Sequence, residues 1–181
     1  VYRISQISVG ESGFFPTIEA YTDAPIMGGN RIEILFNGDD TFPPMLRDIK
    51  NAKSTITFAQ YLYEDGSIAY SLAEAFSERC RAGVRVHILI DSQGSGKIPD
   101  KIPSILHDAG CQIEFFRRVE GSQVLFPWKL LKYNYRNHRR VLVTDGRIGF
   151  TGGYGISEAW SGNGRTENHW RETNARVEGP V

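Results

Sequence analysis

Cysteine is scarce in this 181-residue sequence, which contains only Cys80 and Cys111. Two cysteines cannot build a disulfide framework, and both fall where side chains are expected to be buried, so we predict buried free thiols. The sequence also has no Asn-x-Ser/Thr acceptor for glycosylation. No apolar run approaches the roughly 18 residues that a membrane-spanning helix needs. We therefore expect no transmembrane segment in this piece.

An excess of either charge sign is missing as well, because 21 lysine and arginine residues balance 21 aspartate and glutamate residues. Nonspecific binders of nucleic acid usually carry a basic excess, so the balance argues mildly against that class. A local basic site is still possible, since one segment gathers five cations: Lys129, Lys132, Arg136, Arg139 and Arg140. The length and the 40% share of hydrophobic residues are those of an ordinary globular domain.

The sequence does contain a regular alternation of short β-branched or apolar segments with amphipathic ones. This pattern predicts strands at residues 31–36, 54–61, 84–91, 111–116, 141–144, 148–151 and 173–177. Helices are predicted after a cap at Thr41, between residues 65 and 83, and at residues 98–109. Strands that alternate with helices at this spacing imply βαβ units and a mostly parallel sheet.

Four local features complete this expectation. Residues 1–30 show no sustained period and are expected to form a loosely structured lead-in. Residues 37–40, Asn-Gly-Asp-Asp, are typical of a turn. Residues 84–91 are nearly all apolar, as in a strand covered on both faces. Asp145 and Gly146 favour a hairpin turn between the strands at 141–144 and 148–151.

Most of the functional information lies in residues 137–146, Asn-His-Arg-Arg-Val-Leu-Val-Thr-Asp-Gly. If residues 140–144 form a strand, His138 and Arg140 project from the same face, because strand side chains alternate. An imidazole beside a permanent cation suits attack on a phosphodiester: the imidazole is the nucleophile, and the guanidinium offsets charge on the phosphoryl oxygens. A histidine among basic residues is more often a solvated surface feature. The Asp145 and glycine-pair spacing favours the catalytic interpretation.

The pattern His138-x-Arg140-x4-Asp145-x6-Gly152-Gly153 resembles the HxK(x4)D(x6)G signature of the phospholipase D superfamily, in particular its cardiolipin synthase-like branch. Residues 42–53, 82–86, 91–95 and 170–173 also resemble that branch, and the resemblance covers roughly residues 30–181. It implies an α/β fold, an α-β-α sandwich with a mostly parallel sheet. We expect one such domain over residues 31–181, after the lead-in at residues 1–30.

The resemblance also assigns roles to individual residues. It makes His138, Arg140, Asp145 and Glu172 the catalytic set, with Glu172 accepting a hydrogen bond from the far nitrogen of His138. An exposed glutamate at a strand start is the simpler alternative for Glu172. A hydrogen-bonding role at the turn suits Asp145 better than proton transfer. The candidate residues for binding the substrate phosphate are Ser95, Arg139, Gly152 and Gly153.

This sequence departs from the family pattern at two positions. Arg140 stands where the signature has lysine, and Gly155 stands where an asparagine usually follows the glycine pair. Arginine keeps the charge and can bind phosphate through two N–H groups, but its geometry differs from that of an ammonium. Glycine removes one amide hydrogen bond to the phosphate. The departures leave open a weakened or purely structural half-site.

Other signals are weaker. Residues 91–97 superficially resemble a P-loop, but Asp91 replaces the first glycine and Ile98 the magnesium-binding hydroxyl. A loop at the end of a parallel strand still makes Asp91 and Ser95 candidates for the rim of a site. The four histidines show no metal-ligand spacing. Residues 125–131 are apolar with basic neighbours, as at a lipid interface or in a loop under the core.

We therefore expect phosphodiester transfer through a phosphohistidine, most simply phosphatidyl transfer or hydrolysis on phospholipids, without cofactor or metal. The family uses two motifs that face each other, and this sequence contains one. The absent initiator methionine and the C-terminal end suggest a piece of a longer protein, so the second half either follows Val181 or belongs to a second copy.

A phospholipid or membrane surface is the expected partner, with nucleic acid less favoured. We expect a location in the cytoplasm or peripheral on the inner membrane. A nuclease of the same superfamily and a noncatalytic half are the alternatives.

Overall fold

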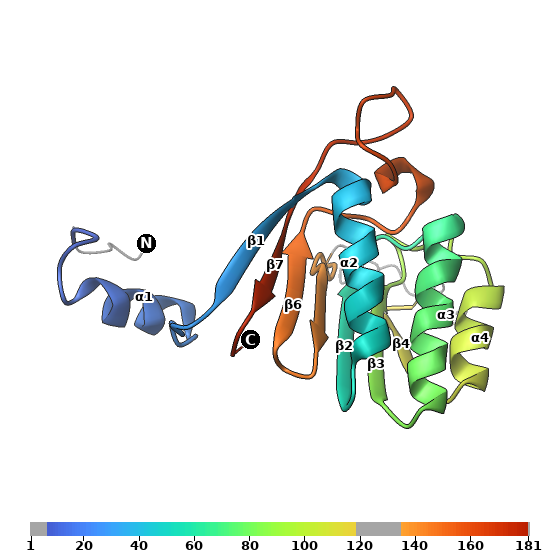
Figure 1. Ribbon diagram of the computed structural model, residues 1–181, viewed down its shortest axis with the longest axis horizontal. Coiled ribbons are helices and arrows are strands. Elements are labelled where there is room, and N and C mark those ends of the chain that lie inside the picture. The colour runs from blue at the N-terminus through green and yellow to red at the C-terminus, as the bar shows by residue number, and fades with distance from the viewer. Residues whose placement is uncertain (1–6, 119–134, 181) are drawn as a thin grey trace, which may run out of the picture.

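The computed structural model describes residues 7–118 and 135–180, which form one mixed sheet with helices (Figure 1). The strands are β1 (Arg31–Phe36), β2 (Thr55–Gln60), β3 (Arg85–Asp91), β4 (Gln112–Phe116), β5 (Val141–Thr144), β6 (Ile148–Gly152) and β7 (Thr173–Glu178). The helices are α1 (Phe14–Thr22), α2 (Asn37–Asn51), α3 (Ser67–Arg81), α4 (Lys101–Asp108) and the short 3-10 helix η3 (Glu158–Trp160). No helix among the described residues is both long and apolar enough to cross a membrane.

The seven strands lie in the order β1-β7-β6-β5-β2-β3-β4. Only β2–β3 and β3–β4 are parallel neighbours, and the other four pairs are antiparallel. These pairings mean that β1, β2, β3, β4 and β6 run in one direction and β5 and β7 in the other. The α/β class is confirmed, and each predicted βαβ crossover joins strands of the same direction. The sheet itself is mixed, because β5, β6 and β7 are inserted between β1 and β2.

The core lies between the sheet and the three helices α2, α3 and α4, which stand against one of its faces (Figure 1). Every second residue of β2 and β3 points into this layer, including Ile56, Phe58 and Ile88. The helices contribute their apolar stripes at the spacing that amphipathic helices require, for example Leu72 and Phe76 from α3. The prediction that residues 84–91 are covered on both faces is wrong, because Arg85 and His87 in β3 are exposed.

Two expectations for the N-terminal part are also wrong. Residues 14–22 form α1 within the expected irregular lead-in, although none of its residues is buried and it projects away from the sheet (Figure 1). Residues 37–40 are the first turn of α2 and not a separate turn. Asn37 has a left-handed φ of 59°, and Asp40 accepts the backbone N–H of Phe36, so the helix starts directly from β1. Acidic side chains suit this position because they complement the helix dipole.

The prediction of free thiols is wrong as well. Cys80 and Cys111 form a disulfide that joins the last turn of α3 to the residue before β4. Their Cα atoms are 5.5 Å apart, although 31 residues separate them in the sequence. Spacing in the sequence could not reveal this proximity, because it depends on how α3 and α4 pack side by side against the sheet.

Candidate active site

The directions of the strands bring most of the predicted site to one edge of the sheet. The carboxyl ends of β1, β2, β3, β4 and β6 meet the amino ends of β5 and β7 there. Because of this, His138 and Arg140 before β5, the glycine pair at 152–153 after β6 and Glu172 before β7 share one edge. Open α/β sheets gather their ligand sites at such an edge.

His138 is exposed, and its ring stacks on that of Tyr61, with ring centroids 3.9 Å apart and an angle of 20° between the planes. Tyr61 is the first residue after β2. Behind it lies Gly94, where an added Cβ would overlap the Tyr61 ring and carbonyl. Gly94 is therefore a glycine because a side chain would push Tyr61 away from the histidine. The stack fixes the plane of the candidate nucleophile.

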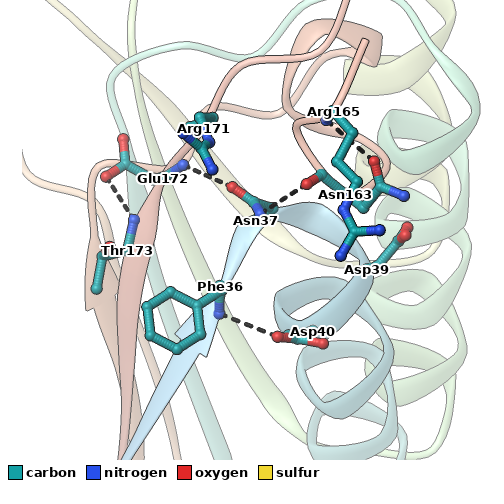
Figure 2. A pocket seen from close by; sticks show the side chains of 9 residues that line it. All are labelled: Phe36, Asn37, Asp39, Asp40, Asn163, Arg165, Arg171, Glu172 and Thr173. Atoms are coloured by element: carbon teal, nitrogen blue, oxygen red, sulfur yellow. Dashed lines mark hydrogen bonds between the residues drawn. The ribbon is translucent and has the colours of Figure 1, made fainter.

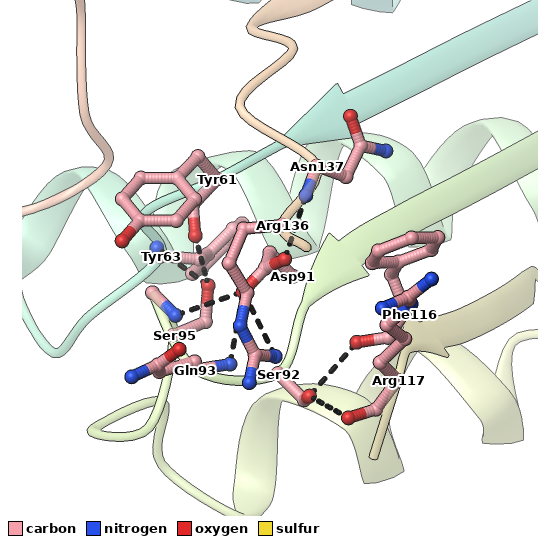
Figure 3. Close-up of polar contacts among 11 residues, drawn as sticks. Tyr61, Tyr63, Asp91, Ser92, Gln93, Ser95, Phe116, Arg117, Arg136 and Asn137 are labelled. Carbon is pink, nitrogen blue, oxygen red and sulfur yellow. Dashed lines mark hydrogen bonds and ion pairs between the residues drawn. The ribbon is translucent and has the colours of Figure 1, made fainter. Parts of the chain in front are cut away.

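The buried carboxylate of Asp91 holds the segment that carries the histidine (Figure 3). One of its oxygens accepts the backbone N–H groups of Gln93 and Gly94 at 3.0 Å, and the other accepts the N–H of Asn137 at 2.9 Å. The guanidinium of Arg136, 4% exposed, is 3.9 Å from this carboxylate. Asp91 thus joins the loop after β3 to the residue that precedes His138. It acts as a positioning residue and not as a ligand of the substrate.

Ser95, a candidate for phosphate binding, has a structural role in this arrangement (Figure 3). Its hydroxyl donates to the carbonyl of Tyr61 at 3.0 Å and accepts the backbone N–H of Tyr63 at 2.9 Å. The residue is 2% exposed. Since the hydroxyl proton is already engaged, the geometry does not support a direct contact between Ser95 and a phosphate. The residue instead fixes the backbone on which Tyr61 stands.

Arg140 is half-buried and reaches toward the glycine pair. One Nη donates a hydrogen bond to the carbonyl of Gly153, and the guanidinium lies 6.0 Å from the ring of Trp160. Burial raises the pKa of the Tyr154 phenol well above its usual range, and the nearby Arg140 charge partly opposes this shift. The cation of the motif is therefore held in place by the segment that follows β6.

Glu172 lies over the same glycine, because a Cβ on Gly153 would overlap its carboxylate. Its Oε1 accepts the backbone N–H of Thr173 at 2.9 Å, and its own N–H donates to Oδ1 of Asn37 at 2.9 Å. Between the described side chains of Glu172 and His138 no hydrogen bond is formed. The predicted hydrogen bond between Glu172 and the far nitrogen of His138 stays a prediction. Glu172 and Arg140, in contrast, both lie against Gly153, whose carbonyl accepts the hydrogen bond from Arg140.

The motif has glycines because neighbouring side chains lie too close to the backbone to leave room for a Cβ. Gly152 has a φ of 154°, and an added Cβ there would overlap the side chain of Asn174, just as one on Gly153 would overlap Glu172. At Gly155 a Cβ would come within 2.9 Å of the ring of Trp160. Trp160 thus occupies the space that the family's asparagine would need, which gives a steric reason for this departure.

Asp145 lies at the opposite edge of the sheet, between β5 and β6. Its carboxylate accepts the backbone N–H groups of Lys53, Ser54 and Thr55 and the hydroxyl of Ser54, at 2.8 to 3.0 Å. Burial alone would raise its pKa, but these hydrogen bonds prevail and lower it to about 2. The role is structural, as the turn position predicts, and the residue does not belong to the edge that carries His138.

The remaining candidates make none of the contacts described above or fall outside the described residues. The exposed Arg139 lines a cavity of about 580 Å³ on the outer face of β2 and β3. His87 lies on a strand face, and His107 is exposed on α4, as predicted. The cations at 129 and 132 and the apolar segment at 125–131 fall outside the described residues. The described residues contain no group of three or more histidine, cysteine or carboxylate side chains that could hold a metal ion.

Sequence reasoning missed two residues of the site. The sequence pattern places Tyr61 at the end of a strand, and an aromatic residue at the carboxyl end of a strand that neighbours the motif is the signal that could identify it. The same pattern places Asn37 in a turn. Its Nδ2 donates to the carbonyl of Asn163 at 2.9 Å while its Oδ1 accepts the backbone N–H of Glu172, so it joins the loop after η3 to the edge that carries Glu172.

Comparison with known proteins agrees with this geometry. A family model described as the cardiolipin synthase, PLD-like domain matches residues 45–178. Cardiolipin synthase A of Pseudomonas fluorescens (strain SBW25) is 32% identical over 157 residues, which cover 87% of this chain and 32% of that protein. The major cardiolipin synthase ClsA of Bacillus subtilis (strain 168) is 32% identical over 154 residues, which cover 83% of this chain and 30% of that protein. The chain spans about a third of the length of these relatives.

Solved structures share the fold at lower identity. The phospholipase D family member Nuc from Salmonella typhimurium is 18% identical, with a TM-score of 0.57, over 83% of this chain and 84% of that chain. Phosphatidylserine synthase from Haemophilus influenzae is 11% identical, with a TM-score of 0.55, over 87% of this chain and 36% of that chain. At these identities the likeness concerns the fold.

Proposed function

Because this chain belongs to the cardiolipin synthase-like branch of the phospholipase D superfamily, we propose that it forms one half of a phosphatidyltransferase. The observation that carries the proposal is that His138, Arg140 and Glu172 share one edge of the sheet, where Arg140 and Glu172 both lie against Gly153. An imidazole, a fixed guanidinium and a carboxylate at one edge suit phosphoryl transfer, because the imidazole can act as nucleophile and the cation offsets charge on the phosphoryl oxygens.

In the proposed reaction a ring nitrogen of His138 attacks the phosphorus of a phospholipid. The N–P bond forms, the P–O bond to the leaving alcohol breaks, and a second histidine donates the proton that this alcohol needs. An alcohol or water then attacks the phosphohistidine, giving up its proton to the second histidine as the N–P bond breaks. The stack on Tyr61 and the Asp91 contacts hold His138 for the first attack, and correct orientation removes much of the entropic barrier.

The second histidine has to come from another phospholipase D-like half, since the described part of this chain brings no other histidine into contact with Tyr61 or with Gly153. The relatives are about three times as long as this chain, which is consistent with a further domain in each of them. We propose that this half pairs either with such a domain or with a second copy of the chain. Phospholipid at a membrane surface is the proposed substrate.

Arg140 and Glu172 have separate parts in this scheme. The guanidinium, held by Gly153, offsets charge on the phosphoryl oxygens as the phosphorus becomes five-coordinate. The Glu172 carboxylate, which rests on the same glycine, stabilises the positive charge that His138 acquires in the phosphohistidine. Side-chain cations supply the electrostatics, so the proposal predicts turnover that EDTA does not abolish.

The test is hydrolysis of bis-nitrophenyl phosphate with EDTA present, by the chain alone and by the chain together with a second phospholipase D-like half. His138→Ala is compared with His87→Ala, which removes an exposed histidine from the outer face of β3. Turnover that His138→Ala abolishes and His87→Ala leaves within a factor of about two supports the proposal. Turnover that survives His138→Ala contradicts it. Absence of turnover both by the chain alone and with the second half present contradicts the proposal and favours a noncatalytic half.

A further inference from the structure

β4 is the last strand at one side of the sheet, and among the described residues it pairs with β3 alone (Figure 1). In a parallel pair, alternate residues of a strand turn their backbone groups toward the neighbouring strand. The N–H of Ser92 donates to the carbonyl of Phe116 at 3.2 Å, so Phe116, and by alternation Glu114, faces β3. The N–H and C=O groups of Ile113 and Phe115 therefore point away from the sheet.

The edge strand at the other side of the sheet, β1, is already partly occupied. Its last residue, Phe36, donates its N–H to the carboxylate of Asp40 at 3.3 Å (Figure 2). In the described part of the chain, no side chain accepts the N–H of Ile113 or Phe115. β4 also contains neither the lysine nor the proline that often protects an edge strand. β4 thus offers a free edge to an extended segment.

Two cavities follow this edge, between β4 and α4. Their volumes are about 620 Å³ and about 270 Å³, and Pro103, Phe115 and Arg118 line both. The guanidinium of Arg118 lies over the Phe115 ring, 5.3 Å from its centroid. Ile113 and Phe115 lie on the helix face, since they pair with buried residues of β3. Residues of an added strand that pair with them would direct their side chains to the same face, about 7 Å apart, where the cavities lie.

The linings of these two cavities are acidic. Asp108 and Glu114 line the larger cavity, and Asp100 lines the smaller one. With the shared Arg118, these three carboxylates give the two linings together a net charge of −2 when His107 is neutral. Among the described residues, the carboxylates of Asp100 and Glu114 form neither a hydrogen bond nor an ion pair. They are therefore available to the cations of a partner.

Both ends of β4 are fixed by contacts outside the strand. Cys111, the residue before it, forms the disulfide with Cys80 of α3. At the other end, the hydroxyl of Ser92 lies 2.8 Å from the carbonyls of Phe116 and Arg117 and donates to them (Figure 3). An edge that is held at both ends needs little ordering when a segment binds to it, which lowers the entropic cost of binding.

We propose that the free edge of β4 binds an extended peptide segment with basic side chains at alternate positions. The segment adds to β4 as a further strand, and its backbone forms hydrogen bonds with Ile113 and Phe115. The stems of its lysine or arginine side chains pack along Phe115, and their charged ends reach the carboxylates of Asp100 and Asp108. A second copy of the chain fits this edge less well, because pairing of β4 with itself brings two sets of carboxylates together.

The probe is the capped heptapeptide Thr-Lys-Thr-Lys-Thr-Lys-Thr, titrated into the 181-residue chain while amide shifts and amide hydrogen exchange are recorded by NMR. We expect shifts in the segments that line the two cavities, residues 92–96, 100–108 and 112–118. At saturation, exchange of the N–H groups of Ile113 and Phe115 should slow about tenfold, because they become hydrogen-bonded. Exchange at Glu114, which already faces β3, should change less. Equal slowing at all three residues would contradict the addition of a strand.

Two control peptides separate backbone pairing from attraction between charges. Methylation of the backbone nitrogens of the lysines keeps every charge and removes the N–H donors that would face β4. Glutamate in place of each lysine keeps the donors and reverses the charge. Each control should bind at least about tenfold more weakly than the probe. Equal binding of the methylated peptide would overturn strand addition, and equal binding of the glutamate peptide would overturn the recognition of basic side chains.

Variants of the chain test the same contacts from the other side. Ile113→Pro removes the outward N–H together with the side chain, whereas Ile113→Ala removes the side chain alone, so the proline variant should lose binding and the alanine variant should keep most of it. Retained dispersion of the amide spectrum verifies folding, and the methylated peptide tests the same hydrogen bonds if the proline variant is unfolded. Binding that survives in a folded Ile113→Pro variant would overturn the proposal.

The carboxylates are tested by the combined change Asp100→Asn, Asp108→Asn and Glu114→Gln. This variant should bind the probe about tenfold more weakly, because it removes the charges that the lysines reach. Glu167→Gln, which changes an exposed glutamate in the loop after η3, should leave binding unchanged. Equal losses in the two variants would mean that the peptide responds to the net charge of the chain and not to this edge.

The His138→Ala variant separates this inference from the proposed function. β2 and β3 lie between β4 and β5, the strand that follows His138, so we expect the variant to bind the probe like the unmodified chain. Binding without phosphodiesterase turnover in the unmodified protein would refute the proposed reaction and leave the peptide site. Turnover without binding would refute the peptide site alone.

Discussion

At the scale of single residues, Asp145 belongs to the family motif, but its carboxylate holds two segments of the fold together. Three backbone N–H groups and one hydroxyl surround its carboxylate. They connect the hairpin between β5 and β6 to the segment that enters β2. Loss of the carboxylate leaves these donors without their acceptor, so we expect Asp145→Ala to lower the free energy of unfolding by about 2–3 kcal/mol at pH 7.

The stabilisation by Asp145 should depend on pH. Its pKa in the folded protein is about 2, below the ordinary value of 3.8, so folding is favoured by the ionised form. The contribution is complete above the ordinary pKa and is lost as the pH falls from about 4 toward 2. Urea unfolding at pH 7 and pH 3 should show a smaller difference between Asp145→Ala and the unmodified chain at the lower pH. A constant difference would mean that the ionised carboxylate is not what stabilises the hairpin.

Arg140 and Gly155, the two departures from the family pattern, are explained together by Trp160. The guanidinium donates to the Gly153 carbonyl and lies 6.0 Å from the Trp160 ring, which fills the space beside Gly155. A lysine would have no planar group to place against the indole while also donating to the carbonyl. We expect Arg140→Lys to reduce phosphodiesterase turnover about tenfold, the effect of losing one charged hydrogen bond.

The control for this prediction is Arg139→Lys, which changes a neighbouring exposed arginine that makes no described side-chain contact with Gly153 or Trp160. It should change turnover less than Arg140→Lys does. Higher turnover in Arg140→Lys would show that arginine weakens this half-site, as the sequence alone allowed.

Residue chemistry could be predicted from the sequence where it depends on near neighbours in the chain. His138, Arg140 and the hairpin at Asp145 follow from local pattern, and the structure gives Asp145 the turn role expected of it. Tyr61 and Asn37 could not be found in this way, because their contacts bridge residues far apart in the sequence. Ser95 was placed on the correct edge, but its hydroxyl is used within the chain.

At the scale of elements, the disulfide joins two segments that meet only after α3 and α4 have packed. It closes a loop of 31 residues. In the chain-entropy description such a loop stabilises the folded state by about 3–4 kcal/mol, since the unfolded chain loses freedom. We expect the paired change Cys80→Ser and Cys111→Ser to lower the free energy of unfolding by that amount in urea.

Reducing agent provides the control for the disulfide. Dithiothreitol should destabilise the unmodified chain to a similar extent and leave the paired serine variant unchanged. If dithiothreitol has no effect on the unmodified chain, the thiols are free, as the sequence suggested.

The elements themselves were predictable because their signals are local. All seven strands and the three packed helices appear near their expected residues, since periodicity and turn chemistry act over short distances. The order of strands was not predictable in this way. Insertion of β5, β6 and β7 between β1 and β2 depends on contacts such as Arg31 with Glu178, across most of the sequence. Helix α1 was missed because its residues lack a buried face, which removes the amphipathic signal.

At the scale of the whole molecule, one edge of the sheet organises the proposed site. The loops after β2 and β3 position His138, and the segment after β6 holds Arg140. Glu172 lies beside them, because a Cβ on Gly153 would overlap its carboxylate. The groups that we propose to act in the transfer thereby lie along one line of strand ends, while the helices on one face of the sheet cover the core.

This arrangement contains one candidate nucleophile, so the source of the second histidine determines what an active assembly looks like. If two copies of the chain pair and share a site, each active pair needs an intact His138 from both members. Mixing equal amounts of the unmodified chain and His138→Ala, at constant total concentration, should then leave about one quarter of the turnover, because only one pair in four has both histidines.

If the second histidine belongs to a further domain of the same polypeptide, the same mixture made with such a two-domain polypeptide should retain about one half. The quarter would identify a homodimer, the half a two-domain enzyme, and turnover independent of the mixing ratio would exclude His138 from the reaction in either form.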